Sequence, residues 1–62
     1  MPIVRVTWFA GRSHEQKAEL ARAITEAVAR IGKTTAEATQ VIFEDVPKEN
    51  WATAGVLKSD RS

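Results

Sequence analysis

The stretch PIVRVTWFAGRSHEQ, residues 2–16, contains the end of one structural element and the beginning of another. The residues at 2–9 are rich in β-branched and aromatic side chains, which predicts a strand. Residues 10–12 form a short connection. Ser13, followed three residues later by Gln16, is a capping box, and this motif predicts that a helix begins there. A strand that leads directly into a capped helix is therefore the first unit of the fold.

The helix predicted over residues 14–31 is amphipathic, because its larger apolar residues recur at intervals of three and four. They are Leu20, Ile24, Ala27, Val28 and Ile31. Charged residues occupy the opposite face, where Glu26 and Arg30 have a spacing that supports an exposed helix by roughly 0.2–0.5 kcal/mol. Gly32 suits the position just past the last turn, which is commonly left-handed. One face of the helix should therefore pack and the other should face water.

The second half of the chain returns to strand-forming residues. TQVIFEDV, residues 39–46, predicts a second strand, and residues 47–50 a turn. Residues 51–57, with Gly55 in the middle, predict a short hairpin or arm. The expected fold class is α/β: one domain over residues 1–62, built as a small β-α-β unit with parallel strands and a C-terminal hairpin.

Two parallel strands and one helix leave a sheet edge and a sheet face uncovered. A chain of 62 residues buries little apolar surface, and without cysteine it has no disulfide to compensate. We therefore expect two protomers to pair into a four-stranded sheet carrying two helices, with further stacking to cover the other face.

Composition excludes several classes of function. The net charge is +1 with acids and bases interleaved, so neither nucleic acid nor a membrane surface is expected as a partner. The uncharged runs are too short to span a bilayer, and the first residues lack the features of a secretory signal, so the cytoplasm is the expected compartment. The absence of cysteine excludes thiolate and zinc-finger chemistry, and the lone His14 suggests no metal site.

Pro2 permits two interpretations. A proline at the mouth of a strand can simply tolerate an edge position. Alternatively, removal of Met1 would make Pro2 the first residue and expose a reactive secondary amine. While Met1 remains attached, the Pro2 nitrogen is an amide without a basic lone pair.

The start MPI, the segment GRSHEQK at residues 11–17, and a second strand followed by a glycine-containing hairpin resemble the 4-oxalocrotonate tautomerase family. The resemblance spans essentially the whole chain. It implies a β-α-β protomer, a dimer as building block and a hexamer of three dimers. It also implies keto–enol tautomerisation of unsaturated 2-oxo acids, as in aromatic degradation, without metal or cofactor.

The resemblance also implies roles for individual residues. Pro2 corresponds to the catalytic amino-terminal proline, and Arg12 to the arginine that holds a substrate carboxylate. Trp51 lies where family members place an aromatic pocket wall, and Phe9 is counted with it among the residues that contact substrate. Gln40 is the departure, because many active members have there a second arginine, supplied by a different subunit.

These residue types suit the chemistry. Tautomerisation needs a group that accepts and returns a proton near the working pH, and an apolar wall and a nearby cation would lower the pKa of the Pro2 amine toward that range. A guanidinium such as that of Arg12 grips a carboxylate with two parallel hydrogen bonds. Gln40 offers a donor but no charge. Since losing one oxyanion donor costs about 10²–10³ in turnover, we expect weak activity on dicarboxylates.

Other functions stay open at this point. The chain could be a silent or poorly active subunit that assembles with a paralogue, as Gln40 suggests, or a related hydratase or dehalogenase, although no acid among Glu44, Asp45 and Glu49 can be assigned to such chemistry. A dimeric strand–helix–helix DNA binder is the third class, and a strand at residues 39–46 would exclude it.

Overall fold

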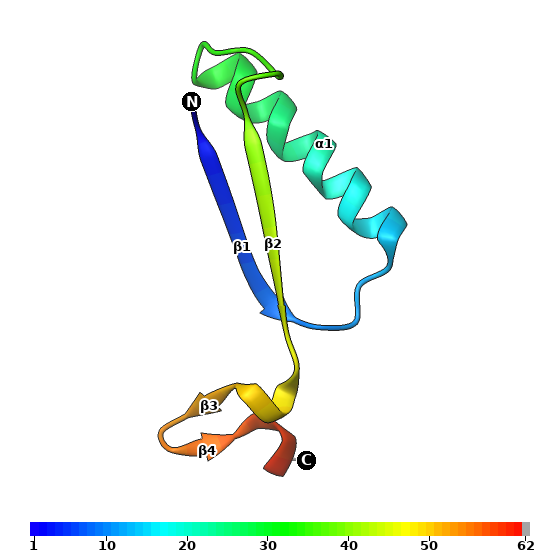
Figure 1. Ribbon diagram of the computed structural model, residues 1–62, viewed down its shortest axis with the longest axis vertical. Coiled ribbons are helices and arrows are strands. Elements are labelled where there is room, and N and C mark those ends of the chain that lie inside the picture. Colours follow the sequence, from blue (N-terminus) through cyan, green and yellow to red (C-terminus); the bar gives the residue numbers. More distant parts are fainter. Residues whose placement is uncertain (62) are drawn as a thin grey trace.

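The computed structural model describes residues 1–61, and Figure 1 shows the order of the elements along the chain. They are β1 (Ile3–Phe9), α1 (His14–Ile31), β2 (Gln40–Val46), the 3-10 turn η1 (Lys48–Asn50), β3 (Ala52–Thr53), β4 (Val56–Leu57) and the 3-10 turn η2 (Lys58–Asp60). The predicted strand–helix–strand order and the C-terminal hairpin are confirmed. Because residues 40–46 form a strand, the strand–helix–helix DNA-binding fold is excluded.

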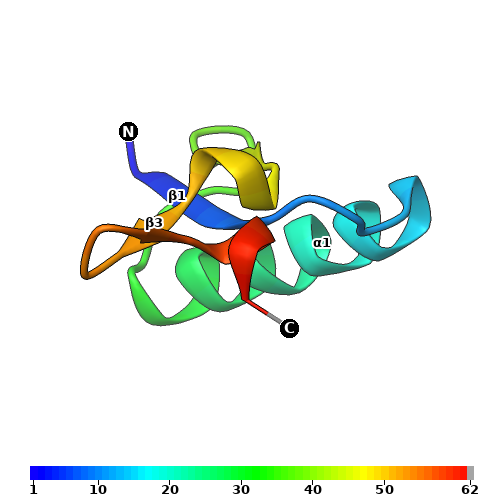
Figure 2. The ribbon, with the colours of Figure 1, turned by 90° about the horizontal axis from the view of Figure 1, so that it is seen from below.

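Strands β1 and β2 lie side by side and parallel, in a register that pairs Ile3 with Gln40 and Phe9 with Val46. Exposure alternates along the first five residues of both strands. The alternation breaks near their carboxyl ends, where Trp8 and Phe9 are both half-buried and Glu44 and Asp45 are both exposed. Figures 1 and 2 show α1 running along one side of this pair, and no second α-helix among residues 1–61 covers the opposite side. The sheet is therefore covered on one face only, as the sequence predicts for an isolated protomer.

Helix α1 begins with the predicted capping box. The Gln16 backbone N–H donates to Ser13 Oγ at 3.2 Å, and the Ser13 backbone N–H donates to Gln16 Oε1 at 2.9 Å. These reciprocal bonds satisfy donors that a helix start would otherwise leave unpaired. Local contacts thus fix the start of α1. They also fix where Arg12, the residue just before the cap, lies relative to the helix.

The end of α1 differs from the sequence prediction in two respects. Gly32 is right-handed, with φ −81°, and the left-handed conformation falls on Lys33, with φ 55°. Glycine is nevertheless required at 32, because a Cβ there would lie 2.6 Å from the carbonyl oxygen of Val28. Ile31, predicted on the packed face, is 73% exposed, since it is the last helical residue and the protomer leaves it uncovered.

The C-terminal hairpin extends away from the β1–β2 pair (Figure 1). Its two strands are antiparallel, with Ala52 opposite Leu57. Ala54 and Gly55 make the turn, with φ values of 54° and 79°. Two consecutive left-handed residues are the signature of the type I′ turn that matches the twist of a two-residue hairpin.

The protomer has no core of its own. Among residues 1–61 no side chain is fully buried, and the chain extends over 43 × 24 × 14 Å. The open face of the sheet presents Ile3, 59% exposed, and Ile42, 38% exposed. No helix within residues 1–61 is long and apolar enough to cross a membrane. Pairing into a larger sheet stays a prediction, which this shape favours.

Candidate active site

The start of β1 brings together two of the predicted site residues. Pro2 is half-buried, and its carbonyl oxygen accepts a hydrogen bond from the Gln40 backbone N–H at 2.9 Å. Met1, the residue before it, is 88% exposed. Parallel pairing thus fixes the backbone of Pro2 beside Gln40 at one end of the sheet.

The far end of β1 brings together the other three. The rings of Phe9 and Trp51 meet at 4.6 Å between centroids with a 56° tilt, which connects the sheet to the hairpin segment. Arg12 donates from Nη1 to the carbonyl oxygen of Phe9 at 2.8 Å. An aromatic pair and a guanidinium therefore meet just beyond the carboxyl end of β1.

These two groups lie apart within one protomer. Phe9, at the end of β1, lies seven residues after Pro2, which at about 3.3 Å per residue corresponds to roughly 23 Å. No enclosed pocket is present over residues 1–61. The effect that the sequence predicts for Trp51 and Arg12 on the Pro2 amine is therefore not available within one protomer.

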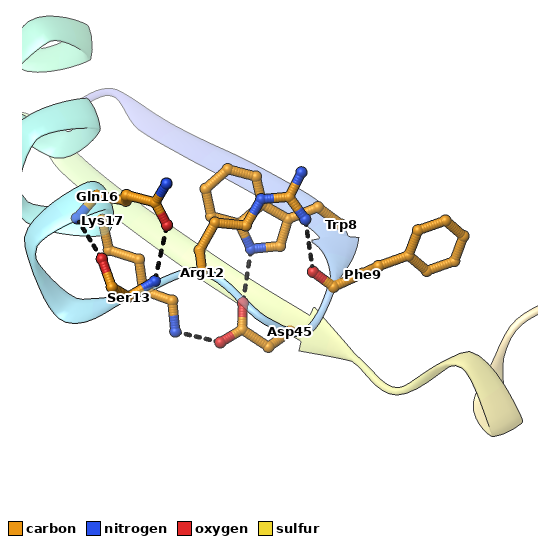
Figure 3. A network of polar contacts seen from close by, with 7 residues as sticks. All are labelled: Trp8, Phe9, Arg12, Ser13, Gln16, Lys17 and Asp45. Carbon is orange, nitrogen blue, oxygen red and sulfur yellow. Dashed lines mark hydrogen bonds and ion pairs between the residues drawn. The ribbon is translucent and has the colours of Figure 1, made fainter.

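A polar network beside Arg12 was not predicted from the sequence (Figure 3). The indole Nε1 of Trp8 donates to Asp45 Oδ1 at 2.6 Å, and Lys17 forms an ion pair with Asp45 Oδ2. The guanidinium carbon of Arg12 lies over the Trp8 ring, 4.5 Å from its centroid. The sequence held one usable signal: Trp8 and Asp45 face each other if the two strands run parallel in the observed register.

The charge on Asp45 is stabilised by its neighbours. The hydrogen bond from Lys17, and after it the one from Trp8, hold the pKa of the Asp45 carboxyl below its ordinary value. The positive charge of Arg12 acts in the same direction with a smaller effect. Asp45 is therefore an anion at neutral pH, and its own partners occupy both of its oxygens.

Comparison with known proteins connects these residues to a family. The family model described as tautomerase enzyme matches residues 2–61, from Pro2 to the end of the described chain. The chain belongs to the tautomerase family. This tautomerase is 45% identical over 58 residues to a probable tautomerase of Streptococcus thermophilus, an alignment that covers 94% of this chain and 95% of the relative.

Comparison with solved structures relates this tautomerase to a narrower group, the 4-oxalocrotonate tautomerases. It is similar to the crystal structure of a 4-oxalocrotonate tautomerase homologue, with 39% identity, a TM-score of 0.92, and coverage of 100% of this chain and 98% of that one. It is also similar to a heterohexameric 4-oxalocrotonate tautomerase from Chloroflexus aurantiacus, with 35% identity, a TM-score of 0.87 and full coverage of both chains. The resemblance read from MPI and GRSHEQK is confirmed, and the protein is an enzyme of the tautomerase type.

Proposed function

We propose that this tautomerase interconverts the keto and enol forms of an unsaturated 2-oxo acid, with Pro2 as the general base. The observation that carries the proposal is the position of Pro2 immediately before β1, where its carbonyl oxygen accepts a hydrogen bond from the Gln40 backbone N–H. Once Met1 is removed, the ring nitrogen becomes a secondary amine on a fixed backbone. Such an amine can take a proton from the substrate hydroxyl and return one to carbon.

Arg12 is the proposed carboxylate ligand. Within the part of the chain that the structure describes, the only ion pair joins Lys17 to Asp45, so no carboxylate neutralises the Arg12 guanidinium. Toward residues 1–61, the Arg12 side chain donates from Nη1 alone, to the Phe9 carbonyl oxygen. The remaining N–H groups are therefore free to make the paired hydrogen bonds that a carboxylate accepts.

The proposed site lies between protomers. Pro2 would come from the start of β1 in one protomer, and Phe9, Arg12 and Trp51 from the far end of β1 in another. Gln40, at the start of β2, would reach the site from a different subunit than Pro2, as the family resemblance implies. The lack of a pocket in residues 1–61 and the exposed Ile3 beside Pro2 support this arrangement. A dimer-based homo-oligomer, with a hexamer as the expected form, would supply the sites.

The proposed substrate has one carboxylate. Gln40 would bring an amide to the site in place of a cation, so a second carboxylate there would find a hydrogen-bond donor but no opposite charge. An enol whose other end is uncharged loses no binding energy at this position, because it has no second carboxylate to pair with a cation. We therefore place monocarboxylate 2-hydroxydienoates ahead of dicarboxylates as substrates.

A second candidate is a subunit of a hetero-oligomer with a paralogue that contributes the missing cation. Two observations favour it: Gln40 itself, and the similarity to a tautomerase from Chloroflexus aurantiacus that is a heterohexamer. Under this alternative the chain alone would assemble an incomplete site.

The deciding experiment is the intact mass of the purified protein before and after incubation with a small alkylating 2-oxo acid. Peptide mapping then locates the adduct. We expect Met1 to be absent and one adduct per chain on the Pro2 nitrogen, formed more slowly in Arg12→Ala. Loss of Met1 with Pro2 unmodified, while other side chains react, would contradict a self-sufficient enzyme and favour the hetero-oligomer.

A further inference from the structure

Trp8 occupies a junction between three parts of the protomer. It is the half-buried residue next to the end of β1, and its ring stacks on Phe43 of β2 with 5.3 Å between centroids and 13° between planes. Arg12, from the connection to α1, lies over the same indole at 4.5 Å. The stacking on Phe43 restrains the orientation of the Trp8 indole, and the Arg12 guanidinium lies over the face of that indole.

Asp45 restrains the edge of that indole. Its Oδ1 accepts from Trp8 Nε1 at 2.6 Å, opposite Trp8 in the strand register. Its Oδ2 accepts from Lys17, one turn into α1, whose backbone N–H in turn donates to the Ser13 carbonyl oxygen at 3.1 Å. Figure 3 shows this chain of contacts from the helix start, through the carboxylate, to the ring under Arg12.

The same contacts keep Asp45 from neutralising Arg12. Asp45 is close enough to Arg12 for the arginine charge to lower the pKa of its carboxyl. A carboxylate so near could also pair with the guanidinium and compete with a substrate carboxylate. Lys17 and Trp8 each donate to one of its oxygens and so orient the carboxylate toward themselves, and Asp45 makes no ion pair with Arg12. The arginine is held by a ring face and a backbone oxygen, which leaves its charge uncompensated.

We propose that Trp8 is a positioning residue for Arg12: the indole, restrained by Asp45, holds the guanidinium in place before substrate arrives. This inference rests on the proposed function, in which Arg12 binds a substrate carboxylate. An exposed arginine otherwise loses side-chain conformational entropy when a ligand orders it. An indole that orders it beforehand therefore strengthens substrate binding and leaves the proton transfer at Pro2 unchanged.

The test compares Trp8→Leu, Trp8→Phe and the wild type on an enol carboxylate and on its neutral methyl ester. We expect Trp8→Leu to raise KM for the acid by about 5- to 20-fold with little change in kcat, and Trp8→Phe, which keeps a ring face, to raise it by only about 2- to 4-fold. The KM of the ester should not change, because Arg12 has no carboxylate to hold.

The matched control is Thr7→Val. Thr7 Oγ1 donates to Glu44 at 3.0 Å, so this change also removes one cross-strand side-chain bond between β1 and β2, at the neighbouring position and without contact to Arg12. We expect its KM to stay at the wild-type value for both substrates. Equal increases for acid and ester in Trp8→Leu, or an increase that persists in the Arg12→Ala background, would overturn the positioning role.

A second measurement separates this inference from the proposed function. Aromatic ring currents shift the NMR signals of Arg12 side-chain protons that lie over an indole, whether or not the protein turns over a substrate. We expect those signals to move to ordinary arginine positions in Trp8→Leu and to stay in Thr7→Val. Unmoved signals would refute the positioning role, whereas shifted signals with no turnover and no Pro2 adduct would refute the proposed function alone.

Discussion

At the scale of single residues, Gln40 is the position that most separates this chain from the pattern it resembles. Its backbone N–H donates to the Pro2 carbonyl oxygen, and residue 40 is exposed at that end of the sheet. An amide there can donate to a developing enolate but adds no positive charge. Under the proposed function, substrate choice at this part of the site therefore depends on the Gln40 side chain.

Gln40→Arg should raise kcat/KM for a dicarboxylate enol by about 10- to 100-fold, because the cation pairs with the second carboxylate and stabilises the developing oxyanion. The value for a monocarboxylate should change much less. Steady-state kinetics on the two substrates measure the ratio, and Gln40→Leu, which removes the donor, is the control. An unchanged ratio would mean that residue 40 does not face the substrate.

At the scale of elements, the junction from β1 to α1 carries both the stability of the helix start and the position of Arg12. Ser13 and Gln16 close the capping box, and one residue earlier the Arg12 side chain folds back onto the end of β1. The network of Trp8, Asp45 and Lys17 holds the same junction from the sheet side. Changes at this junction should therefore affect folding and substrate binding together.

Ser13→Ala should lower the free energy of unfolding by about 1 kcal/mol, since the Gln16 backbone N–H loses its acceptor. Ser59→Ala is the control: Ser59 is an exposed serine in η2, a turn without a side-chain cap bond, and its change should stay within about 0.5 kcal/mol. Urea denaturation monitored by tryptophan fluorescence gives both values. Equal effects of the two substitutions would argue against the cap.

Acid should weaken the same junction. The folded-state pKa of Asp45 is lowered by Lys17 and Trp8, so its stabilising contribution is present above the unfolded-state pKa. That contribution is lost as pH falls through the folded-state value, in the range below about pH 4.

As pH falls, we expect the free energy of unfolding to decrease less steeply in Asp45→Asn than in Glu44→Gln. The second substitution removes a neighbouring carboxylate on the other face of β2. Denaturation midpoints from pH 7 downward measure the two slopes. Parallel curves for the two variants would contradict a special role for Asp45. Because Asp45 is exposed to solvent, added salt should reduce the difference.

At the scale of the whole molecule, the protomer is a thin plate with one open face. Residues 1–61 form no buried core, and the apolar side chains of Ile3 and Ile42 are exposed on the open face of the sheet. Water would cover that face in a monomer at an unfavourable free energy of roughly 25 cal/mol per Å² of apolar surface. Assembly supplies the missing core and, under the proposed function, also brings the two ends of β1 together.

Dilution should therefore lower the melting temperature, because folding is linked to association. Ile42→Lys, which puts a charge on the open face, should lower the melting temperature further, reduce the assembly in sedimentation experiments and abolish Pro2 labelling. Glu26→Lys, on the charged face of α1, is the control and should retain all three properties. A melting temperature independent of concentration in the wild type would show that the protomer is stable alone.

The sequence by itself determined what depends on neighbours along the chain. The capping box at Ser13 and Gln16, the strand at residues 40–46 and the hairpin around Gly55 each follow from a few adjacent residues, because turn and cap conformations are local. MPI and GRSHEQK were sufficient to indicate the family. The left-handed residue at the helix end was misplaced by one position, because it is Lys33. Glycine is needed at residue 32 for another reason, its close approach to the Val28 carbonyl oxygen.

Only the tertiary structure decided which side chains meet. Trp8 and Asp45 are 37 residues apart in sequence, and Lys17 and Asp45 are 28 apart. Strand register brings these partners into contact, and no local pattern encodes register when both faces of a strand carry apolar residues. The same geometry separates Pro2 from Arg12 by the length of β1, because a strand is extended and cannot bring its own two ends together.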